Sequence, residues 1–430
     1  MVPITVEFSQ KNLTGNAGLT QVGRFAENLG LKSALHDTMT LERGANAQYQ
    51  VSDVIPMVMM GVLAGARHIS HLDLLRHDAV LRDLFEWDAF PVGSTIGRLF
   101  KQFTHRHCQE LAEVEDGLRQ KVWGQQWKGR ITLDLDSTVR GVSGHQEGAE
   151  KGYNPKKYGQ ASYHPLLGFL GETRECFHNW FRPGHTHSAN GSAEFVKECR
   201  ARLPKSVWKV WCRADSAFFD GKLLDVLEAQ QCYYTIKVAM RGLTTLLEAQ
   251  SWRGVNKHPG WEATVFQHRC GGWSRSRRFV AVRRRKETVN TEGLFPVTEV
   301  TYEYFCYVTT LSWTPWGIHR YYGQRATCEN WIGWCKSQMA AGSVLTQSFW
   351  ANSALFQTCL LAYNLLVWLL WVTHKHELRE EPETIRGWLI RVPGKLAEHA
   401  RKRVLKLPQD WWAKDRWMHI HERVTALQFA

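Results

Sequence analysis

The stretch from Arg130 to Val139 reads "RITLDLDSTV", and it sets the expectation for how the middle of the chain folds. Its apolar and polar side chains alternate, which is typical of a β-strand with two different faces. One face carries Ile131, Leu133 and Leu135, and the other carries Thr132, Asp134 and Asp136. Because an unpaired carboxylate is costly to bury, two acids on such a strand need a structural or chemical reason.

Outward from this strand, the sequence predicts an alternation of strands and helices. Further strands are expected over 162–171, 174–184, 206–216 and 232–238, and helices over 192–203 and 220–230, the second capped by Asp220. More strand-like runs follow between 240 and 312, together with a cluster of basic residues: Arg275, Arg277, Arg278, Arg283, Arg284, Arg285 and Lys286. This order indicates an α/β fold.

The first 125 residues are expected to be mostly helical, because apolar residues recur at helical spacing over 51–65 and 71–85. A further helix is expected near 94–101, with Ser94 or Thr95 as the capping residue and Arg98 and Lys101 in its first two turns. A short basic helix of this kind fits a DNA groove, as in a helix-turn-helix, and it fits equally an ordinary amphipathic helix.

The composition favours an acidic partner. The 430 residues include 54 Lys and Arg against 41 Asp and Glu, a formal net charge of +13. Such a balance most often serves nucleic acid, although it also serves solubility alone. The ten Cys form no CxxC pair, which argues against a zinc knuckle. Several lie in apolar runs, as Cys212 does, which indicates reduced, buried thiols in a cytosolic protein. The amino-terminal residues have no basic start followed by an apolar run, so no signal peptide is expected.

One apolar segment, from Cys359 to Val372, imitates a membrane span. Its uninterrupted apolar parts are shorter than the roughly 20 residues that a spanning helix needs. Asn364 lies in its middle, and His374, Lys375 and His376 follow it directly. We therefore expect a buried core helix and no membrane association.

Two acids stand at the ends of predicted strands. Asp136 ends the first strand and Asp215 ends the strand over 206–216, each directly before a Ser. Strand ends are where a sheet offers side chains to a cleft. Each Asp could simply cap the helix that follows it. Two such acids in one sheet would repel each other, however, and Mg²⁺ between them would remove the repulsion, because it prefers hard oxygen ligands.

A third acid lies in "YYGQRATCENWIGWCK", from Tyr321 to Lys336. At about 100° per residue, one continuous helix places Tyr322, Arg325, Glu329 and Lys336 within about 60° of one another. An Arg–Glu pair at this spacing contributes only about 0.3–0.5 kcal/mol and explains neither Tyr322 nor Lys336. Basic groups on both sides of a metal-binding acid would instead hold phosphates.

The spacing Tyr-x2-Arg-x3-Glu-x6-Lys, after two Asp motifs, resembles the signature of the DDE transposases of bacterial insertion sequences, in the broad insertion-sequence-4-like clan. Here it is filled by Tyr322, Arg325, Glu329 and Lys336. The segments "DLDST", "RADSAFF" and "AYNLL" look most like the insertion-sequence-1380-type group. The resemblance covers residues 10 to 410. It implies a ribonuclease-H-like catalytic core with a β-strand insertion before the third acidic residue, plus an N-terminal helical domain.

The resemblance also implies roles for individual residues. Catalysis and the binding of two Mg²⁺ (or Mn²⁺) ions fall to Asp136, Asp215 and Glu329. DNA contacts fall to Tyr322, Arg325 and Lys336, and the further candidates are Lys156, Lys157, Arg275, Arg277, Arg278, Arg98 and Lys101. Asp134 shares a strand face with Asp136 and could be the first ligand instead. Asp136 is preferred because it lies nearer the strand end and is followed by Ser-Thr.

By this resemblance the chain divides into five segments. They are a helical DNA-binding domain (1–125), the first part of the core (126–239), the β-rich insertion (240–312), the second part of the core with the catalytic Glu helix (313–378), and a C-terminal region for dimerisation (379–430). The implied protein is a cut-and-paste transposase that binds double-stranded DNA at its terminal inverted repeats. It would act as a homodimer on paired transposon ends and target DNA, in the bacterial cytoplasm at the nucleoid.

Other readings stay open. The chain could be a catalytically inactive or domesticated DNA-binding protein of transposase origin. A Tyr nucleophile, as in recombinases, is disfavoured because Tyr322 stands beside an acid and not in an Arg–His–Arg cluster. His164, His178, His185 and His187 could suggest a metal cluster, although the last two fit a polar turn better.

Overall fold

The computed structural model describes residues 2–44, 46–124, 129–152, 157–290, 297–343, 346–374, 380–399 and 402–429. The chain forms two compact units. Unit 1 comprises Met1–Gln126, Arg140–Ala149 and Ile332–Ala430, and unit 2 comprises Trp127–Val139 and Glu150–Trp331. The last boundary along the chain, between Trp331 and Ile332, falls inside a helix, α12 (Ala326–Gln338). The functional segments expected from the sequence stay predictions.

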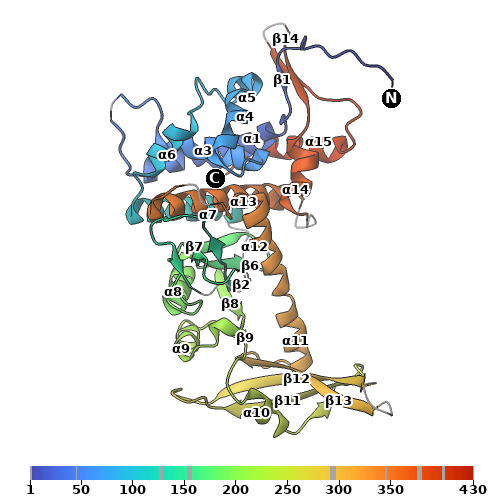
Figure 1. Cartoon of the computed structure of the whole chain (residues 1–430). Coiled ribbons are helices and arrows are strands. Elements are labelled where there is room, and N and C mark those ends of the chain that lie inside the picture. Colours follow the sequence, from blue (N-terminus) through green and yellow to red (C-terminus); the bar gives the residue numbers. More distant parts are fainter. Residues whose placement is uncertain are drawn as a thin grey trace. The chain divides into compact units, whose positions relative to one another are not determined.

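Unit 2 is built on one large mixed sheet. Its strands are β2 (Gly129–Ser137), β6 (Leu166–Leu170), β7 (Cys176–Trp180), β8 (Val207–Ala214), β9 (Tyr233–Lys237), β10 (Arg253–Gly254), β11 (Trp261–His268), β12 (Arg277–Asn290) and β13 (Val297–Thr309). They lie side by side in the order β10-β11-β12-β13-β9-β8-β2-β6-β7 (Figure 1). The centre is parallel, since β8 pairs parallel with both β2 and β9, and the flanking β6 and β13 are antiparallel.

The remaining elements of unit 2 are short strands and helices. They are β4 (Glu150–Lys151), β5 (Ala161–Tyr163), α8 (Ser192–Arg202), the single turn η3 (Ser216–Phe218), α9 (Gly221–Ala229), α10 (Leu243–Glu248) and α11 (Pro315–Gly323). The predicted order of strands and helices from Arg130 to Val238 is confirmed, and so is the cap of α9, where Asp220 accepts from the Leu223 amide. The fold is therefore mixed α/β.

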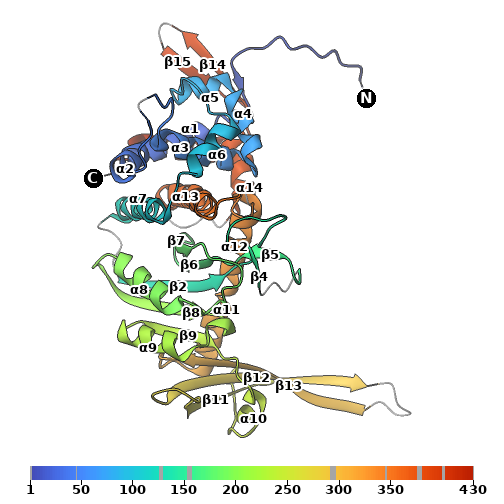
Figure 2. The ribbon, with the colours of Figure 1, turned by 60° about the vertical axis from the view of Figure 1, so that its left-hand side comes forward.

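The longest strands of unit 2 form the β12–β13 hairpin (Figure 2). The two strands pair antiparallel from Phe279 opposite Val308 to Asn290 opposite Val297. Near the start of β12, Val280, Ala281 and Val282 are fully buried, so both faces of the strand are covered there. The strand-rich run expected between 240 and 312 thus joins the edge of the main sheet.

Unit 1 is mostly helical. Its helices are α1 (Leu19–Leu29), α2 (Leu31–Thr38), α3 (Val51–Ala64), α4 (Asp73–Arg76), α5 (Ala79–Leu84), α6 (Gly93–Phe100), α7 (His105–Trp123), α13 (Phe349–His374), α14 (Pro382–Ile385) and α15 (Lys414–Ala426), with the turns η1 (Ile69–Leu72) and η4 (Arg386–Ile390). Its strands are β1 (Leu13–Thr14), β3 (Arg140–Gly141), β14 (Gly394–His399) and β15 (Lys402–Lys406). β14 pairs antiparallel with both β1 and β15.

The start of α6 differs from the prediction. The capping position is Val92, which has no side-chain oxygen, and the Thr95 amide already donates to the Val92 carbonyl over 2.9 Å. Ser94 and Thr95 therefore lie inside the first turn, and the expectation that one of them caps the helix was wrong. The backbone hydrogen bond closes the turn, so a capping side chain is not needed there.

The long apolar helix α13 is buried. By length and composition it could cross a membrane, and 83% of its most apolar window lies inside the protein. The side-chain amide of Asn364, fully buried, donates to Glu115 of α7. Glu115 in turn accepts from Arg119 over 3.0 Å. A polar group in the middle of the helix thus has a partner inside unit 1, as expected of a core helix.

Asn364→Leu should destabilise unit 1, because it leaves buried Glu115 with one donor fewer. Loss of such a hydrogen bond costs about 1–3 kcal/mol. In a unit of this size that lowers the melting temperature by roughly 3 °C or more. Differential scanning calorimetry measures the change.

Thr358→Val is the matched control, because the Thr358 hydroxyl donates only to the Ala354 carbonyl of its own helix. We expect the control to change the melting temperature by less than half as much. Equal effects of the two substitutions would show that the contact between Asn364 and Glu115 does not support the core.

Candidate active site

The central parallel strands bring two acids together. In the register of β2 and β8, Asp134 pairs with Arg213 and Leu135 with Ala214. Asp136 and Asp215 come next on their chains, so both lie where the two strands end. The carboxyl ends of adjacent parallel strands meet at one edge of a sheet, which is why residues 79 positions apart in sequence become neighbours.

The segment that carries Glu329 is two helices and not one. α11 ends at Gly323 and α12 begins at Ala326. At the junction the Arg325 amide donates to the Tyr322 carbonyl over 2.9 Å. This bond spans three residues and closes a tighter turn than the four-residue bond of an α-helix. Gly323 is a poor helix former. The Thr327 hydroxyl donates a hydrogen bond to the Gln324 carbonyl at 2.7 Å. The expectation of one continuous helix from Tyr322 to Lys336 was therefore wrong.

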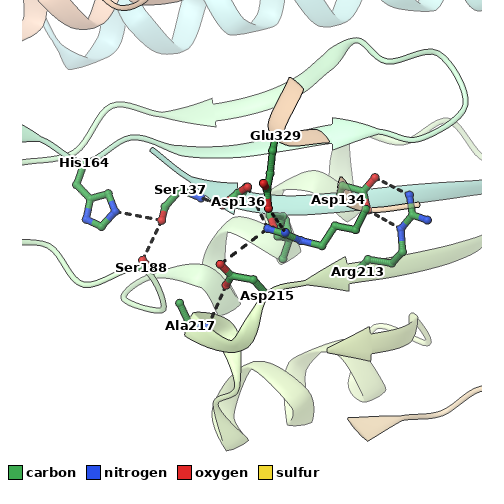
Figure 3. A network of polar contacts seen from close by, with 11 residues as sticks. Asp134, Asp136, Ser137, His164, Ser188, Arg213, Asp215, Ala217 and Glu329 are labelled. Carbon is green, nitrogen blue, oxygen red and sulfur yellow. Dashed lines mark hydrogen bonds and ion pairs between the residues drawn. The ribbon is translucent and has the colours of Figure 1, made fainter. Parts of the chain in front are cut away.

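Arg325 lies at this junction, and its guanidinium stands among the three acids. Nη2 is 3.0 Å from Asp136 Oδ2 and 3.9 Å from Asp215 Oδ2. Nη1 is 3.3 Å from Glu329 Oε1. Figure 3 shows Asp136, Asp215 and Glu329 pointing toward one another from three different elements. The structure thus brings together the three residues that the sequence singled out as catalytic.

The two Asp side chains are each fixed through one oxygen. Asp136 Oδ1 accepts from the Ser137 amide over 2.8 Å, and Asp215 Oδ1 accepts from the Ala217 amide over 2.9 Å. Asp215 therefore caps the short helix η3 through Oδ1, as the alternative to a metal-binding role predicted. In both residues the other oxygen, Oδ2, faces Arg325.

Burial and charge act in opposite directions on this group. Burial raises the pKa of Asp136 to about 6, and neighbouring Asp215 and Glu329 also raise it, while Arg325 lowers it. The acids around Arg325 raise the pKa of its guanidinium against the effect of burial, so it stays charged. Burial raises the pKa of Tyr322 to about 12. The acids therefore form one electrostatically coupled group with a cation at its centre.

The donor set fits a divalent metal ion. Carboxylate oxygens are the hard ligands that Mg²⁺ and Mn²⁺ prefer, and three of them turn toward one point. As the side chains stand, no group of three or more His, Cys, Asp or Glu in the described ranges could hold a metal ion. The Arg325 guanidinium fills the space between the acids. Metal binding would thus require this side chain to move.

Asp134 has a different role from Asp136. It is fully buried, and its two oxygens accept from Arg213 Nε at 2.6 Å and Nη2 at 2.7 Å. Arg213 Nη1 also donates to the Tyr321 carbonyl at 2.9 Å, near the end of α11. This bidentate pair ties β2 and β8 to the helix before Arg325. The preference for Asp136 as the ligand agrees with this arrangement.

Sequence reasoning missed Arg213. The signal was present, because Arg213 stands two residues before Asp215 and so shares its strand face. Once β2 and β8 are taken as parallel neighbours, a buried acid and a buried base on the same face predict an ion pair.

A second network holds the end of β2. His164 Nδ1 donates to the Thr186 carbonyl at 2.6 Å, so its Nε2 accepts from the Ser137 hydroxyl at 3.0 Å. The Ser188 hydroxyl then donates to Ser137 Oγ at 2.8 Å (Figure 3). Burial lowers the pKa of His164, which agrees with a neutral ring. The network fixes the residue directly after Asp136 and was not foreseen from the sequence.

The four histidines do not form a metal cluster in the parts of the chain that the structure describes. His178 Nε2 lies 2.8 Å from Glu198, and His185 pairs with Glu150. His164 has the Ser137 partner described above. Each of these three histidines thus has its own polar partner.

The signature residues for DNA contact are only partly exposed. Tyr322 is half-buried, with its ring 4.7 Å from the ring of Tyr307. Arg325 is buried among the acids. Lys336 is half-buried on the part of α12 that belongs to unit 1. As arranged, neither the Arg325 guanidinium nor the neutral Tyr322 phenol is fully open to a phosphate.

The arginines at the start of β12 and just before it already have partners. Arg277 is buried and pairs with Asp225 and Glu228, and Arg275, which is exposed, also pairs with Glu228. Arg278 donates to two backbone carbonyls. The charge that this cluster offers to DNA is therefore smaller than the sequence indicates, and burial leaves Arg277 no direct access to a phosphate in this arrangement.

Three of the remaining basic candidates are exposed. Arg98 of α6 and Lys101, the residue directly after that helix, are exposed, and Arg98 donates to the Thr95 hydroxyl at 3.1 Å. Lys157 is exposed too, whereas Lys156 lies outside the described residues. Their contact with DNA stays a prediction.

The chain is similar to the piggyBac transposase in a cryo-EM structure of its synaptic complex with hairpin DNA, at 15% sequence identity and a TM-score of 0.45, over 89% of this chain and 82% of that one. A search of the curated proteins found no match. The family described as "Transposase DDE domain group 1" matches residues 2–429. The chain therefore belongs to the transposase DDE domain family.

Proposed function

We propose that this protein is a cut-and-paste transposase that binds the terminal inverted repeats of its insertion sequence, cleaves the DNA and transfers the strand. The observation that carries the proposal is the convergence of Asp136, Asp215 and Glu329 on a single cation. Membership of the DDE family supports transposition chemistry in general. The Tyr-Arg-Glu-Lys signature and the insertion-sequence-1380-type motifs support the narrower assignment.

The proposed chemistry is phosphoryl transfer. Two Mg²⁺ or Mn²⁺ ions bound by the three carboxylates would activate the attacking hydroxyl and stabilise the leaving oxygen. The chain's own residues set up that chemistry. The Ser137 and Ala217 amides orient the two Asp so that Oδ2 of each faces the centre. Glu329 stays largely exposed, so DNA can approach from its side.

The proposed fold and partners follow the family. A parallel centre of β2, β8 and β9 with an antiparallel neighbour fits a ribonuclease-H-like core, and β10 to β13 fit the strand insertion of the clan. We propose double-stranded DNA as partner, at the transposon ends and the target. We also propose a homodimer in the synaptic complex, with residues 379–430 contributing, and a place at the nucleoid in the bacterial cytoplasm. The net charge of +13 supports a nucleic-acid partner.

Glu329→Gln should abolish cleavage and leave DNA binding nearly intact. The substitution keeps the size of the side chain and removes the charge needed to hold a metal ion. We expect cleavage of a duplex carrying the transposon end to fall at least about 10³-fold, as after loss of an essential catalytic group. A gel assay with Mg²⁺ measures cleavage, and anisotropy of the labelled duplex measures binding.

The same assay separates the alternatives. Equal cleavage by both proteins would contradict the assignment of Glu329. Tight binding with no cleavage by the wild type would favour an inactive or domesticated DNA-binding protein. Glu303→Gln, at a half-buried acid on β13 that pairs with Arg284, serves as the control for loss of one negative charge and should cleave normally.

Metal affinity should fall below pH 6. Burial raises the pKa of Asp136 to about 6, so acidification through that value neutralises a proposed ligand. Because folding raises this pKa, the free energy of unfolding of the metal-free protein falls as the pH rises from the ordinary pKa of an Asp to about 6. Below pH 6, we expect Mn²⁺ affinity to drop about tenfold per pH unit, because one proton competes with the ion. Electron paramagnetic resonance of free Mn²⁺ between pH 5 and 8 measures it.

Asp136→Asn is the control for this titration and should bind Mn²⁺ weakly at every pH. Unchanged affinity of the wild type from pH 8 to pH 5 would rule out Asp136 as a ligand.

A further inference from the structure

We propose that Arg325 is a built-in counter-ion that occupies the metal site and that metal ions must displace. The inference rests on the proposed function, because it takes Asp136, Asp215 and Glu329 as the metal ligands. It goes beyond it in assigning Arg325 a role before DNA is bound. The side chain holds three acids together when no ion is present, and it keeps them closed to ions.

The contacts of the guanidinium support this role. Its two terminal nitrogens contact all three carboxylates, at 3.0, 3.3 and 3.9 Å. Nη2 also lies 3.3 Å from the Leu135 carbonyl. Only 5% of the side chain is exposed. Because a delocalised cation at this place offsets the repulsion between the acids, it does electrostatically what a bound divalent ion would do.

The contacts of Arg325 also allow its guanidinium to move away from the acids. Its Nε is buried without a hydrogen-bond partner, and two of its three contacts with acids are longer than an ideal charged hydrogen bond. The residue belongs to the tight junction between α11 and α12, where the backbone is not held by a full set of helical bonds. The cation is thus held by charge more than by geometry.

The contrast with Arg213 shows what a permanent arginine looks like in the same sheet. Arg213 binds both oxygens of Asp134 at 2.6 and 2.7 Å and a backbone carbonyl at 2.9 Å. Arg213 thus has a bidentate partner, whereas Arg325 divides its charge among three. When metal ions displace Arg325, its guanidinium becomes available for a DNA phosphate, the partner that the family resemblance assigns to it.

The test is Mn²⁺ binding to the full chain without DNA, by electron paramagnetic resonance at pH 7.5. The site loses its competitor in Arg325→Gln, so Mn²⁺ should bind at least about tenfold more tightly than to the wild type, equivalent to about 1.4 kcal/mol. Arg320→Gln is the matched control, because Arg320 is an exposed arginine of α11 without a contact to these acids. Its affinity should stay within about twofold of the wild type.

A second variant and a second readout cover loss of folding. Arg325→Lys keeps a positive charge but has no planar fork to contact three acids. Its Mn²⁺ affinity should therefore lie between that of the wild type and that of Arg325→Gln. Without metal, Arg325→Gln should melt below the wild type, and Mn²⁺ should raise its melting temperature by more than it raises that of the wild type.

The outcomes separate the two levels of the proposal. Equal or weaker Mn²⁺ binding by Arg325→Gln and Arg325→Lys, with measurable binding by the wild type, overturns the counter-ion role and leaves the metal site standing. Failure of the wild type and both variants to bind Mn²⁺ overturns the proposed metal site itself, and the inference with it.

Discussion

Repulsion among three carboxylates at the end of two parallel strands is the constraint on which the rest of the site depends. Asp136 and Asp215 come from neighbouring strands, and Glu329 comes from a helix. Like charges at such distances are stable only with a cation among them. In the structure that cation is Arg325, and in the proposed reaction it is a pair of metal ions. The arrangement of the acids therefore requires a cation among them, and the proposed reaction requires that this cation can be exchanged.

Polar contacts cross-link the elements around the acids. The buried pair of Asp134 and Arg213 joins both strands and also holds the end of α11 through the Tyr321 carbonyl. Breaking a buried pair of this kind on one side leaves an uncompensated charge, which is strongly destabilising. On the other side, the network of His164 and Ser137 fixes the residue after Asp136. Two polar networks thus surround a site whose own contacts are looser.

The strands and their two acids could be predicted from the sequence, because alternation reports directly on which face is buried. The expected strands agree with β2 and β8 to within two residues at each end. The apolar helix around Asn364 could be recognised as core for a similar reason, since one amide interrupts it. What remained out of reach was the break between α11 and α12 at Gln324 and Arg325. A helical wheel assumes one straight helix, and the junction depends on Gly323 and on the Thr327 hydroxyl.

Partners across the sheet were also invisible. The sequence shows a run of arginines near residue 277, but not that Asp225 and Glu228 would neutralise them from α9. Burial of Arg325 was hidden for the same reason, because a basic residue in a polar segment looks exposed. The identity of the acids could thus be predicted, whereas the cation that holds them could not.

The most direct test of the account is the anomalous scattering of Mn²⁺ in crystals of the full chain soaked with that ion. The account predicts an anomalous peak within coordination distance of the carboxylates of Asp136, Asp215 and Glu329, with the Arg325 guanidinium moved out of the space between them. A peak at other residues, or Arg325 still among the three acids in crystals that have taken up Mn²⁺, would contradict it.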